Sequence, residues 1–457
     1  MKGRIQTGGG GMENLFDSFM DFASRRVAAW ERYLRVFARW IVLALLAGTL
    51  CGAVGSAFHH SVHLAGELRE RFPWLLWLLP AAGLAIVRVY QVTKTEGQGT
   101  NDILDQIHQG KKVSPWLLPA IFLCTALTHL CGGSAGREGA ALQMGGVIGY
   151  HSARLFRMDD TDRRTATVAG MAAFFTALFG TPMTATVFAL TVVSVGRMYQ
   201  ADMFPCLLSS LTAYGVSRLL NVEPTRFTVE VPALSVGMAA KVILLSMLCA
   251  LLSVLFCETI HVTERVFHRG VKNPWVRAAV GGGVIVILTL LCGTRDYNGA
   301  GMEVITAAVE QGTARPGAFL LKLLFTAVTL AAGFKGGEVV PSFFVGAAFG
   351  AAVGPLLGIP AGFAAALGLT GVFCGATNTA LASVFLGVEL FGAEGLAYYG
   401  LTCAVSFVLS GYSGLYSSQT ILYSKFKARY INVHANARRV WSRPAPPRIT
   451  DGTDKAE

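Results

Sequence analysis

Charged residues are scarce in this sequence. Only 14% of its 457 residues are Asp, Glu, Lys or Arg, whereas a soluble globular protein typically has about a quarter. Hydrophobic residues make up 53% of the chain, and the mean hydropathy is +0.52. This balance excludes an ordinary soluble domain and indicates an all-α protein that crosses a membrane several times.

The sequence also lacks the spacing of a disulfide framework or a metal-binding motif. All nine Cys lie in apolar runs without close pairs, so we interpret them as buried small hydrophobic residues. The net charge of +11 is concentrated near the chain ends. This distribution is typical of the topology of a membrane protein, and it does not indicate nucleic-acid binding. We therefore expect no nucleic-acid partner, no cofactor and no resident metal.

Histidines supply the only candidates for a metal site. His59, His60 and His63 follow the first apolar span, and His59 and His63 share one face of a helix. No Cys or carboxylate stands at a matching spacing, so we interpret the three as an interfacial cluster. A second pair, Glu258 and His261, is interpreted as part of a solvated helix end. An alternative function is a membrane-embedded enzyme that uses the first histidine cluster. We predict instead that the protein is not an enzyme.

Four parts follow one another along the chain. The segment 1–39 contains a predicted amphipathic helix over 12–39, whose arginines would face lipid head groups. Residues 40–220 and 221–420 are two predicted membrane repeats, separated by a polar break. Residues 421–457 form a basic tail. The basic flanks place both termini in the cytoplasm.

The two membrane halves resemble each other. Residues 134–149 have a counterpart in 334–350, and 183–193 resemble 380–390. Many spans are short or interrupted by Gly and Pro, which is tolerated at membrane depth where the backbone is buried or lines a cavity. We predict two repeats of opposite topology with broken helices, arranged around a site near the membrane midplane. The alternative is that Gly- and Val-rich helices look alike by chance.

A charged pair, Arg137 and Glu138, stands among small residues in the stretch GGSAGREG. A loop that leads into a helix exposes backbone N–H groups, and such a helix start attracts anions. The carboxylate of Glu138 can occupy the place of the anion when it is ionised, and it loses that attraction when it is protonated. Anion occupancy and proton binding are then linked at one side chain.

GREG resembles the anion-binding loop of the CLC family of chloride channels and proton-coupled anion antiporters. Three further motifs occur in the order of that family: a glycine loop at Gly97–Gly99, G-x-x-x-P at Gly337–Pro341, and a tyrosine, Tyr416, in GLYSSQ. The resemblance covers about residues 40–425. It implies a CLC-type fold of two inverted-topology repeats with about 18 helices per subunit, and a homodimer with one pore in each subunit.

The resemblance also implies roles for particular residues. Glu138 matches the gating glutamate, and Tyr416 matches a tyrosine whose hydroxyl faces the central anion. The first loop departs from the family pattern Gly-Ser-Gly-Ile-Pro, since Gly97–Asn101 reads Gly-Gln-Gly-Thr-Asn. Either Gln98 or, after a shift of one or two residues, Thr100 takes the place of the serine. The predicted anion-binding residues are Gln98, Gly99, Thr100, Gly136, Arg137, Gly139, Val339, Val340 and Tyr416.

Glu338 marks a second departure, because chloride-selective members have an apolar residue there. GGEV, followed after one residue by Pro, resembles the fluoride/proton antiporter branch, in which this glutamate takes part in coupling. That branch usually has threonine where this chain has Val340, and its usual Phe pair beside the first loop is not evident. The internal proton-relay glutamate of the chloride/proton antiporters is also missing, since Thr191 and Val192 match its position. Glu338 would supply the second acid, unless it forms a buried ion pair with Lys335.

We therefore predict a fluoride/proton antiporter that exports fluoride, with Glu138 and Glu338 as the gating and coupling acids. Its partners would be a halide, protons, membrane lipid and a second copy of the chain. A chloride channel or a chloride/proton antiporter of the same family is the alternative. Glu389, a further acid in an apolar run, is interpreted as a capping or packing residue. The absence of large cytosolic domains, common in prokaryotic members, indicates a multi-pass protein of a bacterial inner membrane.

Overall fold

Helices make up most of the chain in the computed structural model, which describes residues 10–427 and 429–436. The first half contains α1 (Gly10–Arg71), α2 (Leu79–Val92), α3 (Thr100–Gln109), α4 (Leu117–Leu130), α5 (Glu138–Leu155), α6 (Asp160–Phe179), α7 (Pro182–Val192) and α8 (Met203–Leu219). The second half contains α9 (Val236–Gly270), α10 (Pro274–Cys292), α11 (Met302–Glu310), α12 (Ala318–Ala331), α13 (Val339–Val353), α14 (Ala361–Thr377), α15 (Ala380–Phe391) and α16 (Leu396–Leu409). Short 3-10 helices cover Pro73–Leu78, Gln200–Asp202, Gly354–Leu357 and Ala393–Gly395.

The lengths of these helices fit a membrane protein with broken spans. Five helical stretches of the described chain are long and apolar enough to cross a membrane, and six further apolar helices are shorter. Sixteen α-helices lie within the described residues, against the roughly 18 helices that the family resemblance implies. Eight of the nine Cys are buried and all are free, which confirms their interpretation as small hydrophobic residues.

The two halves meet in a reciprocal set of hydrogen bonds. Gly136 and Gly337 form an antiparallel bridge, with N···O distances of 2.7 and 2.8 Å. The hydroxyl of Thr329 accepts a bond from the backbone N–H of Ser134 at 3.1 Å, and Thr128 accepts one from Lys335 at 3.3 Å. Each threonine thus caps the loop of the other half. Such reciprocity is what two equivalent units of opposite orientation produce, and it agrees with the predicted inverted repeat.

Glycines let helices cross at close range at equivalent places in both halves. In the first half, a Cβ built on Gly145 of α5 would overlap the backbone carbonyl of Gly170 in α6. In the second half, a Cβ on Gly346 of α13 would overlap the carbonyl of Gly368 in α14. Small residues allow this approach, which gives helix packing in lipid much of its van der Waals energy.

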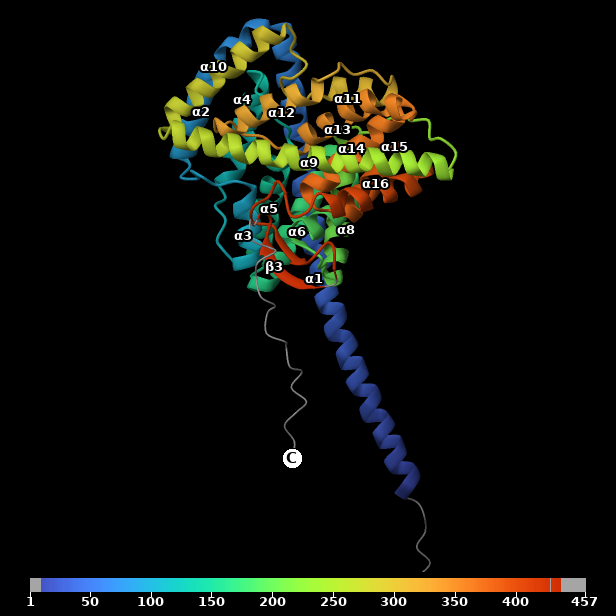
Figure 1. Ribbon diagram of the computed structural model, residues 1–457. Coiled ribbons are helices and arrows are strands. Elements are labelled where there is room, and N and C mark those ends of the chain that lie inside the picture. Colours follow the sequence, from blue (N-terminus) through green and yellow to red (C-terminus); the bar gives the residue numbers. More distant parts are fainter. Residues whose placement is uncertain (1–9, 428, 437–457) are drawn as a thin grey trace, which may run out of the picture.

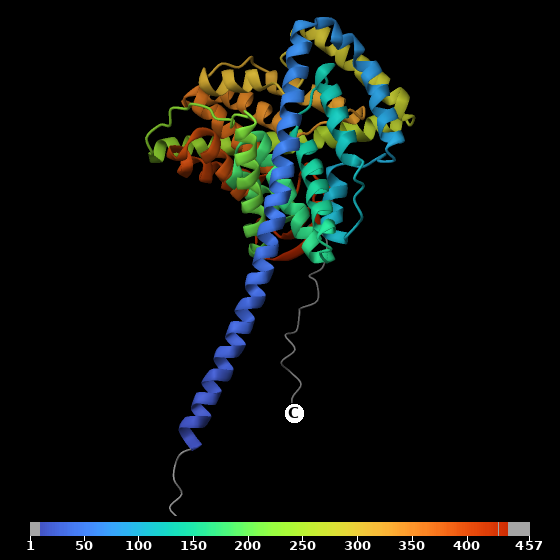
Figure 2. The same cartoon turned by 180° about the vertical axis from the view of Figure 1, so that it is seen from behind.

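The N-terminal helix differs from the sequence-based prediction. A break was expected near residue 39, but α1 is continuous from Gly10 to Arg71 and projects well beyond the helical body (Figures 1 and 2). The described side chains between residues 19 and 39 are exposed. No proline occurs before Pro73, so nothing in the sequence forces the amphipathic segment to end before the first span begins.

A small sheet joins the segment after the last helix to the body. The strands are β1 (Ser194–Val195), β2 (Thr420–Tyr423) and β3 (Tyr430–His434), in the order β1-β2-β3. β1 pairs with β2 in parallel, and β2 pairs with β3 antiparallel. The basic tail predicted from residue 421 therefore begins as part of the fold, and its residues 437–457 lie outside the described structure, as do residues 1–9.

Glu389 confirms its interpretation as a capping residue. Its carboxylate on α15 accepts hydrogen bonds from the backbone N–H groups of Met183 and Thr184, at 3.0 and 2.8 Å. These two residues open α7 in the other half of the chain. A carboxylate at a helix N-terminus satisfies free N–H groups and complements the helix dipole.

We expect Gly145→Ala to lower the thermal stability of the protein. The added methyl group would enter a fully packed helix crossing, and overpacking of this kind typically costs about 1–3 kcal/mol. The measurement is the unfolding temperature of purified protein in detergent. Gly283→Ala on α10 is the matched control, because a Cβ there meets no atom within 4 Å. Equal unfolding temperatures for the two variants would contradict the proposed role of the crossing.

Candidate functional site

The N-termini of α5 and α13 meet at the bridge between the two halves. α5 begins at Glu138 and α13 begins at Val339, directly after the bridged glycines. The side chain of Glu138 is fully buried, and its Oε2 accepts a hydrogen bond from the backbone N–H of Val340 at 3.2 Å. The carboxylate of one half thus lies on the N-terminus of a helix from the other half. This is where two helix dipoles favour negative charge.

The glycines of the GREG and GGEV motifs are required by close contact. A Cβ on Gly136 would overlap Oε2 of Glu138, and a Cβ on Gly337 would overlap the backbone nitrogen of Gly139. A side chain at Gly136 would displace the Glu138 carboxylate, and a side chain at Gly337 would push the two helix starts apart. The motif is therefore explained by the need for two backbones and one carboxylate to share a small space.

Arg137 is turned away from the helix start. Its guanidinium donates a hydrogen bond to Nδ1 of His59 at 3.0 Å, and it lies 5.9 Å from the centre of the Phe179 ring. Its Nε is 4.0 Å from Oε1 of Glu138. Arg137 is thus a positive charge near the helix start, anchored to His59 of α1, and its anion-binding role stays a prediction.

Histidine side chains of α1 border this region without forming a metal site. His60 bonds to the carbonyl of Leu220, and the His59 and His63 rings lie parallel with centres 6.5 Å apart. Among the described residues no group of three potential ligands could hold a metal ion. A cavity of about 630 Å³ is lined by His59, His63, Arg137 and Val340.

Of the two candidates in the first loop, Thr100 contacts α5. Its hydroxyl accepts a hydrogen bond from Nε2 of Gln143 at 3.2 Å and lies 3.5 Å from the carbonyl of Gly139. Gln98 belongs to the preceding turn, where its backbone N–H bonds to the carbonyl of Thr95. Gly99 is the N-cap of α3. The structure therefore places the Thr100 hydroxyl against α5, and a role for Gln98 stays a prediction.

Glu338 lies beside Glu138 at the N-cap position of α13. Its side chain is half-buried, and a Cβ built on Gly139 would be 3.6 Å from its Oε2. The alternative that Glu338 pairs with Lys335 is wrong. The ammonium of Lys335 instead lies 4.2 Å from the centre of the Tyr90 ring, and within the described chain the two side chains form no ion pair. Two carboxylates are therefore brought together at the meeting of the halves.

Tyr416 is buried and has a free hydroxyl. Only 2% of the residue is exposed, and its hydroxyl has no hydrogen-bond partner among the described residues. The same is true of Oε1 of Glu138. Tyr416 lies within the electrostatic range of both Glu138 and Glu338. Buried polar atoms almost always have a partner, so a hydroxyl and a carboxylate oxygen left free in one region are typical of a site for a polar ligand.

The loop that carries Tyr416 is tied to the ends of two helices. Nε2 of Gln419 donates to the carbonyls of Val192 and Thr377, both at 2.9 Å. These carbonyls belong to the last residues of α7 and α14, where no intrahelical partner exists. Ser418 adds a bond from its N–H to the side chain of Asn101, at 3.1 Å. The tyrosine is therefore held from both halves of the protein.

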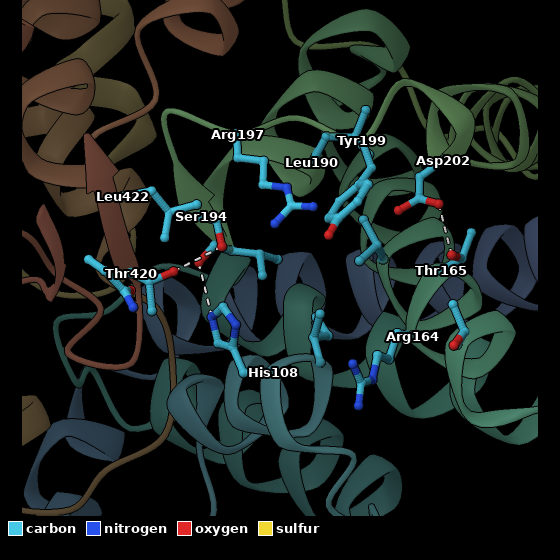
Figure 3. Close-up of a pocket in the computed structure, with 15 residues that line it drawn as sticks. His108, Arg164, Thr165, Leu190, Ser194, Arg197, Tyr199, Asp202, Thr420 and Leu422 are labelled. Carbon is cyan, nitrogen blue, oxygen red and sulfur yellow. Dashed lines mark hydrogen bonds between the residues drawn. The ribbon is translucent and has the colours of Figure 1, made fainter. Parts of the chain in front are cut away.

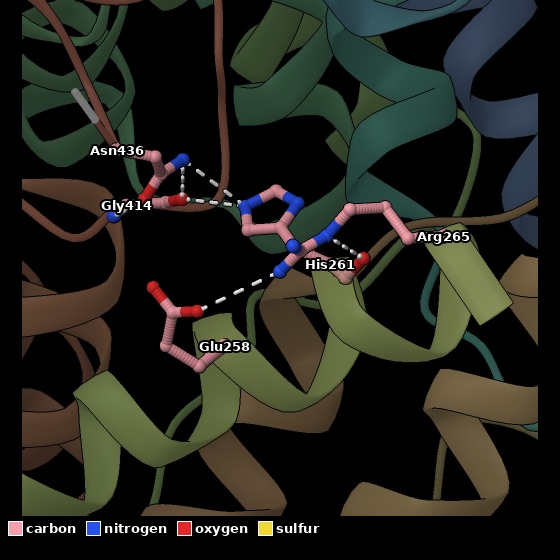
Figure 4. Close-up of polar contacts among 5 residues, drawn as sticks. All are labelled: Glu258, His261, Arg265, Gly414 and Asn436. Carbon is pink, nitrogen blue, oxygen red and sulfur yellow. Dashed lines mark hydrogen bonds and ion pairs between the residues drawn. The ribbon is translucent and has the colours of Figure 1, made fainter. Parts of the chain in front are cut away.

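Asn436 holds the other end of this loop (Figure 4). Its side-chain amide accepts from the N–H of Gly414 at 3.0 Å and donates to the carbonyl of Gly414 at 2.9 Å. Nε2 of His261 on α9 lies 2.9 Å from the same carbonyl. His261 therefore contacts a backbone carbonyl. Glu258 forms an ion pair with Arg265 at 4.0 Å. The sequence alone did not indicate Asn436 or the role of Gln419. Gln419 lies inside the recognised GLYSSQ motif, whereas no sequence pattern points to Asn436.

Comparison with known proteins agrees with this geometry. Residues 81–411 match the model of the voltage gated chloride channel family. The chain belongs to this family, the CLC family. A chloride/fluoride channel protein from Pseudomonas syringae pv. tomato is 35% identical over 401 residues, which cover 86% of this CLC chain and 88% of that protein. A H(+)/Cl(-) exchange transporter from Vibrio cholerae is 27% identical over 387 residues, covering 77% and 81%.

Solved structures of CLC proteins share the fold. The crystal structure of a CLC-type fluoride/proton antiporter matches with a TM-score of 0.82 and 32% identity, over 84% of this chain and 98% of that chain. A slow cyanobacterial Cl⁻/H⁺ antiporter matches with a TM-score of 0.70 and 19% identity, over 81% and 94%. The protein is thus a polytopic helical membrane protein of the CLC fold, as predicted.

We expect Asn436→Ala to lower both the stability and the transport rate of this CLC protein. The substitution removes both side-chain bonds to Gly414, and a buried polar group left without a partner typically costs about 1–3 kcal/mol. Anion efflux from proteoliposomes and the unfolding temperature are the measurements. His434→Ala, at an exposed position in β3, is the control. An Asn436→Ala protein as fast and stable as the control would refute this role.

Proposed function

We propose that the protein exports fluoride in exchange for protons, with Glu138 as the gate and proton acceptor. The observation that supports this most strongly is the hydrogen bond from the Val340 N–H to the buried Glu138 carboxylate. An ionised carboxylate there occupies the place at two helix N-termini that an anion would take. Gating and anion binding would then compete for the same backbone N–H groups.

The transport cycle follows from this competition. A fluoride ion bound at the starts of α5 and α13 displaces the Glu138 carboxylate, and a proton on that carboxylate removes its attraction to the helix starts. Binding of the anion and protonation of Glu138 therefore favour each other, so anion and proton occupancy are coupled at one side chain. The residues proposed to line the anion are Gly99, Thr100, Gly136, Gly139, Val339, Val340 and Tyr416.

Glu338 is proposed as the coupling acid. An ionisable side chain in a membrane protein interior is costly unless it is paired or used in function. Glu338 lies beside the anion site and has no ion-pair partner among the described residues, whereas Lys335 is held by Tyr90. Since Thr191 and Val192 occupy the positions of the internal relay acid, Glu338 would accept the proton that Glu138 releases.

Fluoride is favoured over chloride by the relatives and by the motif. The Pseudomonas relative is named a chloride/fluoride channel protein, and the structure with a TM-score of 0.82 is that of a fluoride/proton antiporter. Glu338 in GGEV also fits the fluoride/proton branch. We further propose a homodimer in lipid, in a bacterial inner membrane with both termini cytoplasmic. Exposed apolar side chains such as Leu211 of α8 and Leu381 of α15 would be covered by the second subunit or by lipid.

The first test is coupled transport in liposomes that contain the purified protein. We expect a fluoride gradient to drive protons in the opposite direction, and a proton gradient alone to drive fluoride uphill. A fluoride electrode and a pH dye report the two fluxes in one experiment. Fluoride flux without an opposing proton flux would establish a channel instead, and equal transport of chloride would establish a chloride transporter.

The second test separates the two acids. Glu138→Ala removes the gate, so we expect anion flux that no longer moves protons. Glu338→Gln keeps the size of the side chain but cannot bind a proton in exchange, so we expect the proton flux to fall while fluoride binding persists. Glu394→Gln, an exposed position before α16, should behave like the unmodified protein. Normal proton coupling in Glu338→Gln would assign the coupling role to another group.

A further inference from the structure

A second cavity lies away from the Glu138 site, on the side of the molecule from which α1 projects. Its volume is about 390 Å³, and it is bordered by α3, α6, the end of α7, and the segment between β1 and α8 (Figure 3). The volume falls in the range of small-molecule sites, about 300–1,000 Å³, and is far larger than one halide ion needs. β2 and β3 also line it, and polar groups come from five segments: α3, α6, the segment from β1 to α8, β2 and β3.

Two arginines give the cavity its charge. Arg197 reaches into it from the segment after β1, and Arg164 lines it from α6 (Figure 3). Neither guanidinium forms an ion pair with any described residue; Arg197 stacks on Tyr199 at 4.2 Å, and Nε of Arg164 is buried without a partner. Arg197 is exposed to solvent, whereas Arg164 is half-buried. Two positive charges on one cavity, without an ion-pair partner among the described residues, favour an anionic occupant.

The acid in this lining does not cancel the two positive charges. Asp202 accepts a hydrogen bond from the hydroxyl of Thr165 at 2.8 Å. Burial raises the pKa of Asp202, and the bond from Thr165 only partly opposes that shift. His108, on the opposite wall, is turned to the carbonyl of Val193 at 3.2 Å. The cavity is therefore positive overall, with hydroxyl, phenol and imidazole groups beside the arginines.

The wall of the cavity is continuous with the loop of Tyr416. The hydroxyls of Ser194 and Thr420 are 2.9 Å apart on its lining, and the N–H of Thr420 bonds to the carbonyl of Val193 at 3.3 Å. The neighbouring Gln419 is the residue that ties the Tyr416 loop to α7 and α14. A ligand in this cavity would thus contact the segment that positions the tyrosine.

We propose that this cavity is a binding site for a phosphate group, held by Arg164 and Arg197, through which an anionic metabolite or lipid regulates transport. A guanidinium presents a planar fork of donors that matches two phosphate oxygens, and two of them balance the double charge of a phosphate monoester. A halide, a single atom, would leave most of this volume unfilled. The proposal does not depend on which anion the protein transports.

Binding is tested on the purified full chain in detergent. Inorganic phosphate, added against a chloride control of equal ionic strength, should raise the unfolding temperature in a saturable manner. We expect this rise to be lost in the double variant Arg164→Gln/Arg197→Gln and reduced in the single variant Arg197→Gln. Because the Arg197 side chain is exposed, misfolding would not explain a loss in the single variant. Arg218→Gln on α8, outside the cavity, should retain it. A rise of equal size in all variants would overturn the proposal.

A second experiment distinguishes the sources of the phosphate group. The protein is placed in nanodiscs of phosphatidylcholine with or without phosphatidic acid, and phosphate is then added. Stabilisation by phosphatidic acid that removes the effect of inorganic phosphate would assign the site to a lipid head group; stabilisation by phosphate in both lipids would assign it to a soluble ligand. In proteoliposomes, the same phosphate concentrations should change the fluoride efflux of the unmodified protein but not of the double variant. Absence of any arginine-dependent effect in both experiments would refute the site.

Discussion

The bridge between Gly136 and Gly337 is the contact on which the proposed anion site depends. It brings the starts of two helices from opposite halves so close that a side chain on Gly337 would overlap the backbone of Gly139, and one on Gly136 would overlap the Glu138 carboxylate. Only then can the Glu138 carboxylate, which begins α5, reach the Val340 N–H of α13. Neither half contains the site alone. The repeat is therefore a requirement of the chemistry, because two helix dipoles must point at one small volume.

Helix C-termini, which carry partial negative charge, are contacted by residues that follow the last helix. The carbonyls at the ends of α7 and α14 receive the amide of Gln419, and Lys425 donates to Asn378 and Ser410, which follow α14 and α16. A cation near helix C-termini complements their partial negative charge. The residues after the last helix thus stabilise the ends of membrane helices and, in the same contacts, hold the Tyr416 loop in place.

The sequence was informative where function needs a local pattern. The small residues around Glu138, the acid at Glu338 and the repeated motif could all be recognised, because a helix start, a close crossing and a buried charge each restrict the residue types allowed. The choice between Gln98 and Thr100 could not be made, since it depends on which residue of a turn meets α5 in three dimensions. Asn436 could not be found either, because its contact with a loop twenty-two residues earlier follows no periodicity.

The two acids lie in equivalent motifs, but their burial and hydrogen bonding differ. Glu138 is fully buried and accepts the Val340 N–H across the bridge, whereas Glu338 is half-buried at the N-cap of α13. Glu138 is the first residue of α5, so its equivalent in the second half is Val339, whereas Glu338 is the N-cap of α13 and its equivalent in the first half is Arg137. Exchange of an anion against a proton, as we propose, requires one acid to compete for the anion site and another to remain available to protons. In the cycle that we propose, this offset of one residue between the two acids would let one repeat gate the pore and the other couple it.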